Sequence, residues 1–239
     1  MVGADGNGRG RTFAHEKLLA LPLPPHTEYD IQKRVNIVFG KLIPSLAGKT
    51  LLDAGCGPGF FTAEAVRRGA EVVALDVGSR LVLSTKLHSR CDGVVADIRQ
   101  LPFKSCSFDA AVCSEVIEHL DRPKEAIAET FRVIRPGGHL ALTTPNRLWL
   151  PMISLADLLG LRRIGALEKW IWPWELLRVL KTVGYTISKI LGFNFLPFFV
   201  PAFFGLVTQL DHLGSRLYPF AINIGVAARR PPDHAAVNI

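Results

Sequence analysis

The stretch "LLDAGCGPGFF", residues 51–61, decides the fold of this chain. A short apolar run ends in Asp53 and is followed by three glycines at alternate positions, Gly55, Gly57 and Gly59. Glycines between a strand and a helix let the backbone turn sharply and approach a ligand closely. The spacing differs from the G-x-G-x-x-G of dinucleotide-binding proteins, and the carboxylate before it would repel a pyrophosphate. The stretch predicts a strand–loop–helix unit whose loop accepts a ligand carrying an ammonium group; a tight turn without a ligand is the alternative.

Strand-like and helix-like segments alternate along the rest of the chain. Short apolar runs predict strands at residues 49–55, 71–78, 92–98, 107–114, 139–145, 185–193 and 220–229. Amphipathic or apolar segments predict helices at residues 60–69, 79–90, 122–138, 148–161 and 173–185. This alternation indicates an α/β domain with a parallel sheet and helices on both faces. The last two strands, joined by a long connection, predict an edge hairpin in which one strand is antiparallel.

Two further carboxylates end predicted strands. Asp76 closes the second strand about twenty residues after the glycine loop, where a carboxylate can accept both hydroxyls of a ribose. Asp97 closes the third strand and is followed by Ile98, a pair able to recognise an adenine by a hydrogen bond and by packing. A loop-capping role for Asp97 stays open.

The stretch "SEVIEHLDRP", residues 114–123, places Glu115, Glu118 and His119 just after the fourth predicted strand. If this segment is the first turn of a helix, the three side chains point the same way. They could then act as an acid/base group, bind a metal, or stabilise a helix N-terminus through its dipole. Ligands of open α/β sheets bind at the carboxyl ends of the strands, so the position favours a function.

Five motifs occur in order over residues 27–150: "LLDAGCGPG", "VVALDVG", "VVADIRQLPF", "SFDAAVCSEVIEHL" and "RPGGHLALTTPN". They resemble the ordered motifs of the class I S-adenosylmethionine-dependent methyltransferases. Within that superfamily, "KRVN", "LDVGSRLVLSTKLH" and "CSEVIEHLDRP" are most similar to the ubiquinone-biosynthesis O-methyltransferase family. The resemblance implies a Rossmann-like, seven-stranded, mostly parallel sheet whose last strand is antiparallel.

The resemblance also implies roles for single residues. Asp53, Gly55 and Gly57 would line the methionine part of S-adenosylmethionine, and Arg34 is a candidate partner for its carboxylate, with a plain surface arginine as the alternative. Asp76 would hold the ribose, Asp97 and Ile98 would flank the adenine, and Ser114 would lie near the sulfonium. The full set expected at the cofactor is Arg34, Asp53, Gly55, Cys56, Gly57, Gly59, Asp76, Val77, Asp97, Ile98, Ser114 and Glu115.

His119 and Glu118 are the expected catalytic residues. Relatives with Glu-x-x-Glu-His at this position include enzymes that bind a divalent metal with a further histidine, which makes Glu115, Glu118 and His119 metal candidates. No histidine occurs between His139 and His212. No metal is therefore predicted, and His119 is expected to act as a base or to contact the acceptor.

The C-terminal third indicates what is methylated. Residues 148–218 are expected to insert into a single domain at 27–230, between a flexible lead at 1–26 and a tail at 231–239. The insertions are rich in aromatic residues: Trp149, Trp170, Trp172, Trp174, Phe193, Phe195, Phe198, Phe199, Phe203 and Phe204. They predict an apolar acceptor channel, and hence methylation of a hydroxyl on a hydrophobic small molecule of the quinone, lipid or isoprenoid type. An RNA 2′-O-methyltransferase and a non-catalytic, cofactor-binding membrane scaffold are the alternatives.

The composition of the chain limits its expected binding partners and its expected cellular compartment. The run at 190–207 holds Asn194, Pro197 and Pro201, so it favours a lid or a peripheral membrane contact over a membrane span. A net charge of +7 without an aromatic-basic platform disfavours nucleic acid. The first residues lack the apolar core of a secretory signal, and the four cysteines form no C-x-x-C pair. The expected location is the cytoplasm, with a contact at the inner face of a membrane; the oligomeric state is not predicted.

Overall fold

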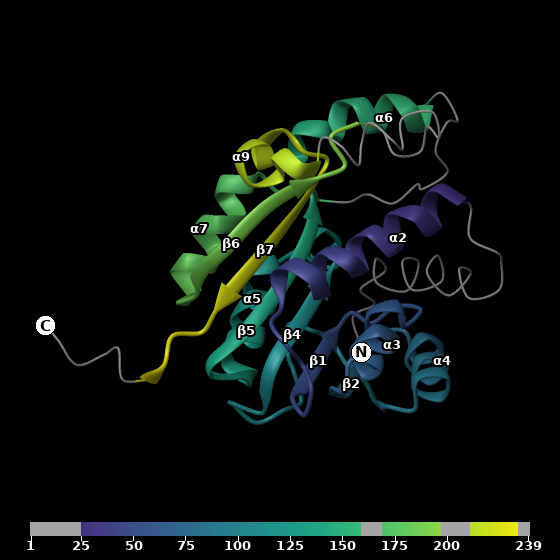
Figure 1. The fold of residues 1–239 in the computed structure, drawn as a ribbon, viewed down its shortest axis with the longest axis vertical. Helices are drawn as coiled ribbons and strands as arrows, with labels where there is room; N and C mark the ends of the chain where they lie inside the picture. Colours follow the sequence, from purple (N-terminus) through teal and green to yellow (C-terminus); the bar gives the residue numbers. More distant parts are fainter. Residues whose placement is uncertain (1–24, 159–168, 197–210, 234–239) are drawn as a thin grey trace, which may run out of the picture.

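The computed structural model describes residues 25–158, 169–196 and 211–233, and in it seven strands form one sheet in the order β3-β2-β1-β4-β5-β7-β6 (Figure 1). The strands are β1 (Thr50–Ala54), β2 (Glu71–Asp76), β3 (Asp92–Val95), β4 (Phe108–Ser114), β5 (Ile134–Pro145), β6 (Thr186–Phe193) and β7 (Asn223–Arg229). The first five pair in parallel, whereas β7 is antiparallel to both β5 and β6. The predicted seven-stranded, mostly parallel sheet with a last antiparallel strand is confirmed.

Helices cover both faces of this sheet. They are α2 (Pro25–Ile37), α3 (Phe60–Arg67), α4 (Ser79–Ser89), α5 (Pro123–Val133), α6 (Leu150–Leu158), α7 (Pro173–Val183) and α9 (Gly214–Leu217), and α2 continues into a π-helical turn, η2 (Val38–Leu42). One core cluster lies under α2, η2 and α3, and the other under α5 and α7. In Figure 1, α6 and α9 lie beyond the carboxyl ends of the parallel strands.

The central strand β1 shows why the sheet is buried on both faces. Leu51 belongs to the cluster beneath α2 and α3, and its neighbour Leu52 belongs to the cluster beneath α5 and α7; both are fully buried. Successive side chains of a strand point to opposite faces, so a strand between two helical layers has a continuous apolar sequence. This explains the run "TLL" before Asp53.

The helix expected at 122–138 is shorter than predicted. α5 ends at Val133, and the next residue, Ile134, already pairs with Phe108 as the start of β5. The segment Pro136–Gly138 lies in β5, where Gly138 O accepts from Arg230 N at 3.0 Å. Proline and glycine correctly signalled the end of a helix. The pairings that make the following residues a strand come from β4 and β7, which no local pattern contains.

Part of the apolar run 190–207 is core and not a lid. Ile190–Phe193 complete β6, and Leu191, Phe193 and Phe195 are buried. Residues 197–207 lie outside the described residues, so the proposed lid or membrane contact there stays a prediction. The lead at 1–24 and the tail at 234–239 also lie outside, whereas α2 begins at Pro25, two residues before the expected domain boundary. Among the residues that the structure describes, no helix is long and apolar enough to cross a membrane.

Candidate active site

The glycine loop begins where β1 ends. The amides of Gly55 and Cys56 both donate to Leu75 O of β2, at 2.7 and 2.9 Å, and Gly55 has a φ of 91°. Only glycine adopts such a backbone without strain. The loop is therefore held against the end of β2 while it turns into α3.

Asp76 joins this loop to the end of β2. One carboxylate oxygen accepts from Gly57 N at 3.0 Å and the other from Gly78 N at 2.9 Å. Each oxygen of a carboxylate has a second lone pair, so both can still accept a hydroxyl. A Cβ added at Gly57 would meet nothing within 4 Å, and the neighbouring Val77 is 58% exposed. An open loop, a carboxylate with free lone pairs and an exposed apolar side chain fit an adenosine group.

Asp53 and Cys56 lie beneath the loop and not on its open side. Asp53 is 1% exposed and accepts a hydrogen bond of 2.6 Å from Thr62 Oγ1 of α3. The Cys56 side chain packs with Ala74 and Val82, and burial raises the pKa of its thiol. The predicted contacts of Asp53 and Cys56 with the cofactor stay predictions.

The buried Asp53 carboxyl makes stability depend on pH. Burial raises the pKa of Asp53 from 3.8 to about 6. The hydrogen bond from Thr62 lowers the pKa in part, and the nearby Asp76 charge raises it slightly. The folded state therefore binds this proton more tightly than the unfolded chain. The stabilisation is complete below about pH 3.8 and is lost as the pH rises through about 6.

We expect Asp53→Asn to be more stable than the wild type at pH 8, by roughly 2–3 kcal/mol at most, because the amide can still accept from Thr62 without burying a charge. The advantage should shrink toward zero near pH 4. Urea unfolding at the two pH values measures it, and Asp92→Asn, at an exposed position on β3, is the control. Equal or lower stability of Asp53→Asn at pH 8 would contradict the assignment of a raised pKa.

Asp97 and Ile98 follow β3 and do not end it, because the strand expected at 92–98 stops at Val95, and the Asp97 carboxylate has a partner. Arg99 Nη2 lies 2.6 Å from Asp97 Oδ2, and Arg99 N donates to Asp97 Oδ1 at 2.8 Å. The hydrogen bonds from the Arg99 side chain hold the pKa of this carboxyl below its ordinary value. Ile98 is buried in the core. An adenine amine would have to share Asp97 with Arg99, while the exposed Val77 offers a surface for the ring.

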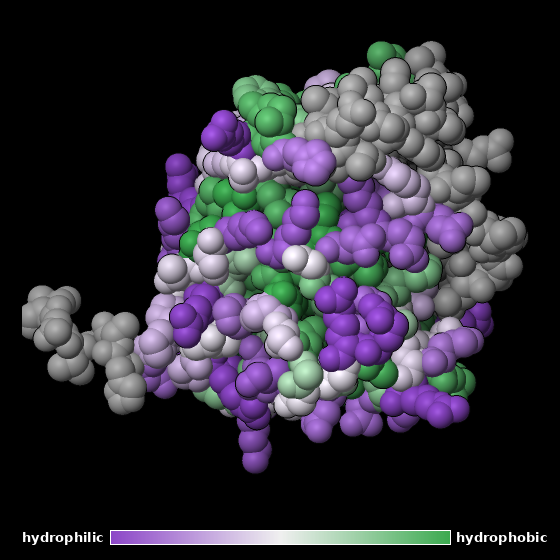
Figure 2. All heavy atoms as spheres, viewed as in Figure 1, coloured by the Kyte–Doolittle hydropathy of each residue, from purple (hydrophilic) through white to green (hydrophobic). Residues whose placement is uncertain are grey.

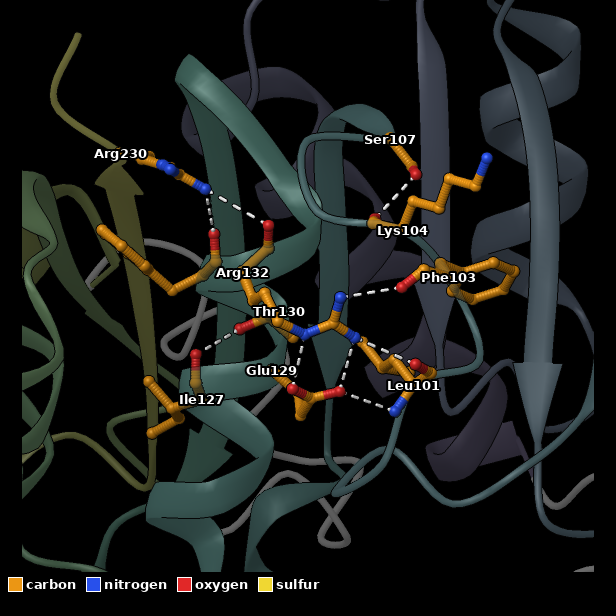
Figure 3. Close-up of polar contacts among 10 residues, drawn as sticks. Leu101, Phe103, Lys104, Ser107, Ile127, Glu129, Thr130, Arg132 and Arg230 are labelled. Atoms are coloured by element: carbon orange, nitrogen blue, oxygen red, sulfur yellow. Dashed lines mark hydrogen bonds and ion pairs between the residues drawn. The ribbon is translucent and has the colours of Figure 1, made fainter. Parts of the chain in front are cut away.

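An ion pair on α5 holds the loop that carries Asp97 (Figure 3). Glu129 accepts from Leu101 N at 2.8 Å and from the Arg132 guanidinium at 2.7 and 2.8 Å. Arg132 in turn donates to Leu101 O at 2.9 Å and to Phe103 O at 2.7 Å. One pair of side chains thus fixes three backbone groups of residues 101–103. These bonds help to position the loop before residue 101, which carries Asp97.

The stretch 114–119 forms a polar relay at the ends of β4 and β5. Thr143 Oγ1 donates to Glu115 Oε1 at 3.0 Å, so its contact of 2.8 Å with Ser114 Oγ must have the serine as donor. Asn223 Nδ2 of β7 reaches Glu115 Oε2 at 3.4 Å. Three strands therefore contribute to the position of Glu115.

Arg34 enters the same edge from α2. Its guanidinium lies 2.8 Å from Asp30 and 3.8 Å from Glu115, and its side chain is only 14% exposed. Its Nε is buried without a hydrogen-bond partner among the described residues. The structure thus places Arg34 at the site and not on the open surface, with one donor unused. Its predicted role toward a methionine carboxylate stays a prediction.

The side chains of Glu115, Glu118 and His119 do not share one helical face, because the segment does not form the first turn of an α-helix. Glu115 has a left-handed φ of 56°, and only Ile117–His119 form a short 3₁₀ helix, η3. Glu118 is 2% exposed and accepts from Thr144 Oγ1 at 3.2 Å, away from the Glu115 relay. Within the described ranges, no group of three or more His, Cys, Asp or Glu side chains has an arrangement suited to a metal ion. The residues present do not form the metal site that the spacing allowed.

A strap from the inserted segment fastens the turn that carries His119. Lys169 N donates to Glu118 O at 2.8 Å, and Lys169 Nζ pairs with Asp121 at 2.8 Å. Two residues later, Ile171 O accepts from Arg147 N at 3.1 Å, just past the end of β5. The strap therefore holds the turn and the end of β5 together at the carboxyl edge.

The aromatic residues expected to line an acceptor channel fall into two groups. Trp170, Phe193 and Phe195 are buried in the protein. Trp172 and Trp174 stack with ring centroids 4.7 Å apart, and Trp174 is 57% exposed. Phe198, Phe199, Phe203 and Phe204 lie outside the described residues. The described part of the chain thus presents one exposed aromatic pair, Trp172 and Trp174, and the acceptor channel stays a prediction.

The glycine loop and the turn that carries His119 are in direct contact. A Cβ built on Gly55 would collide with one methyl group of Val116 and lie 3.2 Å from the other. The residue that opens the loop therefore packs against the residue between Glu115 and η3, so the glycine loop and the turn that carries His119 share one interface.

Gly55→Ala is expected to destabilise the fold by roughly 2–4 kcal/mol, from left-handed strain and overpacking together. Adding Val116→Ala should recover part of this loss, since the cavity accepts the new methyl group; a double-mutant cycle in urea measures the coupling. Gly57→Ala is the control for backbone strain alone, because Gly57 also has a left-handed φ of 49° but a Cβ there would meet nothing within 4 Å. Additive effects of Gly55→Ala and Val116→Ala would contradict the direct contact.

Several site residues were missed by sequence reasoning: Asp30, Thr62, Thr143, Thr144 and Asn223. Thr143 and Thr144 carried a signal, because two hydroxyls followed by Pro145 end a buried strand at the ligand edge. Thr62 carried none, because its complete burial on α3 is visible only in the structure. Asp30 and Asn223 reach the site only through the packing of α2 and β7, which no local pattern reveals.

Comparison with known proteins agrees with this geometry. A model of the methyltransferase domain matches residues 52–142. The ubiquinone biosynthesis O-methyltransferase of Pseudomonas fluorescens (strain SBW25) is 32% identical over 178 residues, which cover 69% of this chain and 75% of that protein. The enzyme of the same name from Pseudomonas aeruginosa (strain UCBPP-PA14) is 32% identical over 166 residues, covering 64% and 71%.

Solved structures share the fold at low identity. An S-adenosylmethionine-dependent methyltransferase from Mesorhizobium loti superposes with a TM-score of 0.65 at 19% identity, over 84% of this chain and all of that one (100%). A geranyl diphosphate methyltransferase in complex with S-adenosylmethionine gives 0.63 at 18% identity, over 89% and 93%. The chain belongs to the class I S-adenosylmethionine-dependent methyltransferases, in the family of the ubiquinone biosynthesis O-methyltransferases.

Proposed function

We propose that this enzyme methylates a hydroxyl group on a hydrophobic small molecule of the quinone, lipid or isoprenoid type. One observation carries the proposal: the turn with His119 packs through Val116 onto the glycine loop. This contact supports a role for His119 as a general base, because it brings the turn beside the glycine loop, at the carboxyl edge where ligands of open α/β sheets bind.

S-adenosylmethionine supplies a methyl group on a good leaving group, so the protein has to align the acceptor and manage its proton. We assign the proton to an imidazole nitrogen of His119, because histidine is the side chain most often used as a general base. The Lys169 strap and the buried Glu118 side chain hold the turn in place. The position of His119 on this fixed turn supports it as the residue that accepts the proton.

The apolar surface at the same edge supports a hydrophobic acceptor. Exposed large apolar side chains lie on two segments, at Leu148, Leu155 and Leu158 of the first and at Leu213, Leu217 and Phe220 of the second. Trp149 Nε1 donates to Phe220 O at 2.9 Å and so ties two of these segments together. We propose that this surface receives the acceptor and lies against the inner face of a membrane, from which an apolar molecule would enter. The names of the curated relatives agree with an apolar quinone-type acceptor.

Methyl transfer to extracted material tests the proposal. Purified enzyme is incubated with S-adenosylmethionine carrying a labelled methyl group and, in separate reactions, with a catechol bearing an isoprenoid tail, a total lipid extract, and a short RNA. Label in the organic phase that depends on His119 supports the proposal. Label in the RNA alone would replace it with a 2′-O-methyltransferase, and cofactor binding without transfer to any acceptor would favour a scaffold.

A further inference from the structure

A second concave site lies on the outer edge of the sheet, apart from the glycine loop. Its volume is about 260 Å³, and its lining residues come from the end of α2 and from η2, β6 and the segment before and within α9. They are Ile37, Lys41, Lys189, Leu191, Gly192, Phe193, His212, Gly214 and Ser215. Figure 2 shows apolar residues over β6, between α9 and the end of α2, with hydrophilic residues around them.

The ionisable groups that line this pocket are all basic. Lys41, Lys189 and His212 are its ionisable groups, Ser215 adds a hydroxyl, and no carboxylate lines it. Neither lysine forms an ion pair within the described part of the chain. Two ammonium groups, an imidazole and a hydroxyl facing one cavity form a donor set for an oxyanion.

A β-bulge directs Lys189 into the pocket. In the pairing of β6 with β7, Ile187 is opposite Ala228 and Lys189 is opposite Ala227, so Ser188 is an extra residue. Ile187 packs against the cluster beneath α5 and α7. Regular alternation would place Lys189 on that face too, whereas the bulge moves it to the face of Leu191 and Phe193.

Two glycines bring the remaining donors close. A Cβ at Gly214 would collide with the carbonyl of Gly192, and a Cβ at Gly192 would lie 2.7 Å from Tyr218 Cα. Because neither residue has a Cβ, α9 lies directly on β6. This contact sets His212 and Ser215 across from Lys189. The bulge and the glycine contact each serve the same cavity, so the pocket is built from features of the fold and not from surface lysines alone.

We propose that this pocket binds a phosphate group whose carrier has an apolar part. The two lysines, His212 and Ser215 take the phosphate oxygens, and the walls of Ile37, Leu191 and Phe193 contact the adjoining hydrocarbon. The same chemistry is offered by a phospholipid headgroup at a membrane surface and by a soluble phosphate compound. The site is separate from the cofactor loop and does not depend on the identity of the methyl acceptor.

The test compares two full-length variants of equal charge. Lys41→Ala/Lys189→Ala removes the pocket ammonium groups; Lys104→Ala/Lys181→Ala removes two exposed lysines elsewhere. Binding of inorganic phosphate is measured by titration calorimetry. Sedimentation measures binding to phosphatidylcholine vesicles with and without phosphatidylglycerol. Thermal melting and cofactor binding confirm that both variants are folded.

The expected result is at least about a tenfold loss of affinity, corresponding to about 1.4 kcal/mol, in the pocket variant and not in its control. A loss seen with inorganic phosphate identifies a soluble ligand. A loss seen only with phosphatidylglycerol vesicles identifies a headgroup. Equal behaviour of the two variants, or no binding of either probe by the wild type, overturns the proposal.

Discussion

Asp76→Ala is expected to weaken the binding of S-adenosylmethionine by roughly 100- to 10,000-fold. The estimate follows from two charge-assisted hydrogen bonds to ribose hydroxyls, each contributing about 1.5–3 kcal/mol. The same carboxylate fastens Gly57 N and Gly78 N in the free protein, so its loss also loosens the loop that the ligand must meet. Calorimetric titration with S-adenosylmethionine and with its demethylated product measures the effect.

Glu71→Ala provides the matched control for Asp76. It removes a carboxylate from the exposed first residue of the same strand, at the opposite end from the site. Thermal melting separates lost affinity from lost folding. If folded Asp76→Ala binds the cofactor within about threefold of the wild type, a factor worth only about 0.7 kcal/mol, the assignment of the ribose site is wrong.

His119→Ala is expected to lower kcat by roughly 100- to 10,000-fold, the usual contribution of a general base, with the cofactor affinity unchanged. The deficit should shrink as the pH rises, because a phenolic acceptor then loses its proton without help. Rates measured from pH 6 to pH 10 with a quinone-type phenol, together with a calorimetric titration of the cofactor, check both parts.

His139→Gln is the control for His119, since His139 lies in β5 opposite Ala110 and Arg229 and is distant from the carboxyl edge. A purely structural His119 would give a deficit independent of pH. Loss of cofactor binding in His119→Ala would show that the residue belongs to the cofactor site and not to the acceptor site.

The sequence predicted the strands and helices better than the side-chain contacts between them. Asp53 and Asp76 are at strand ends because buried parallel strands are apolar until they reach the ligand edge, and that signal is local. The orientation of Glu115 was not predictable in this way. Its left-handed backbone is held by a hydrogen bond from its amide to Thr143 O, and its carboxylate by Thr143 and Asn223, from strands that join β4 only in the folded sheet.

The same limit applies to the C-terminal third. The aromatic residues of this segment were predicted to line a channel. Phe193 of β6 and Phe195 just after it are instead buried in the core. Hydrophobicity does not distinguish a core position from a ligand wall. The decision rests on which elements cover the residue, here α2 and η2, whose packing on β6 follows from contacts more than a hundred residues apart.

The strand order has a consequence for synthesis. β7 lies between β5 and β6, yet it is the last of the seven strands to leave the ribosome. Until then β6 has no neighbour in the sheet, and the edge of β5 exposes unpaired backbone groups. A nascent chain stalled before residue 223 would present that edge to other chains. Protection of β5 by a chaperone, or fast translation of the final segment, would then govern the yield of native enzyme.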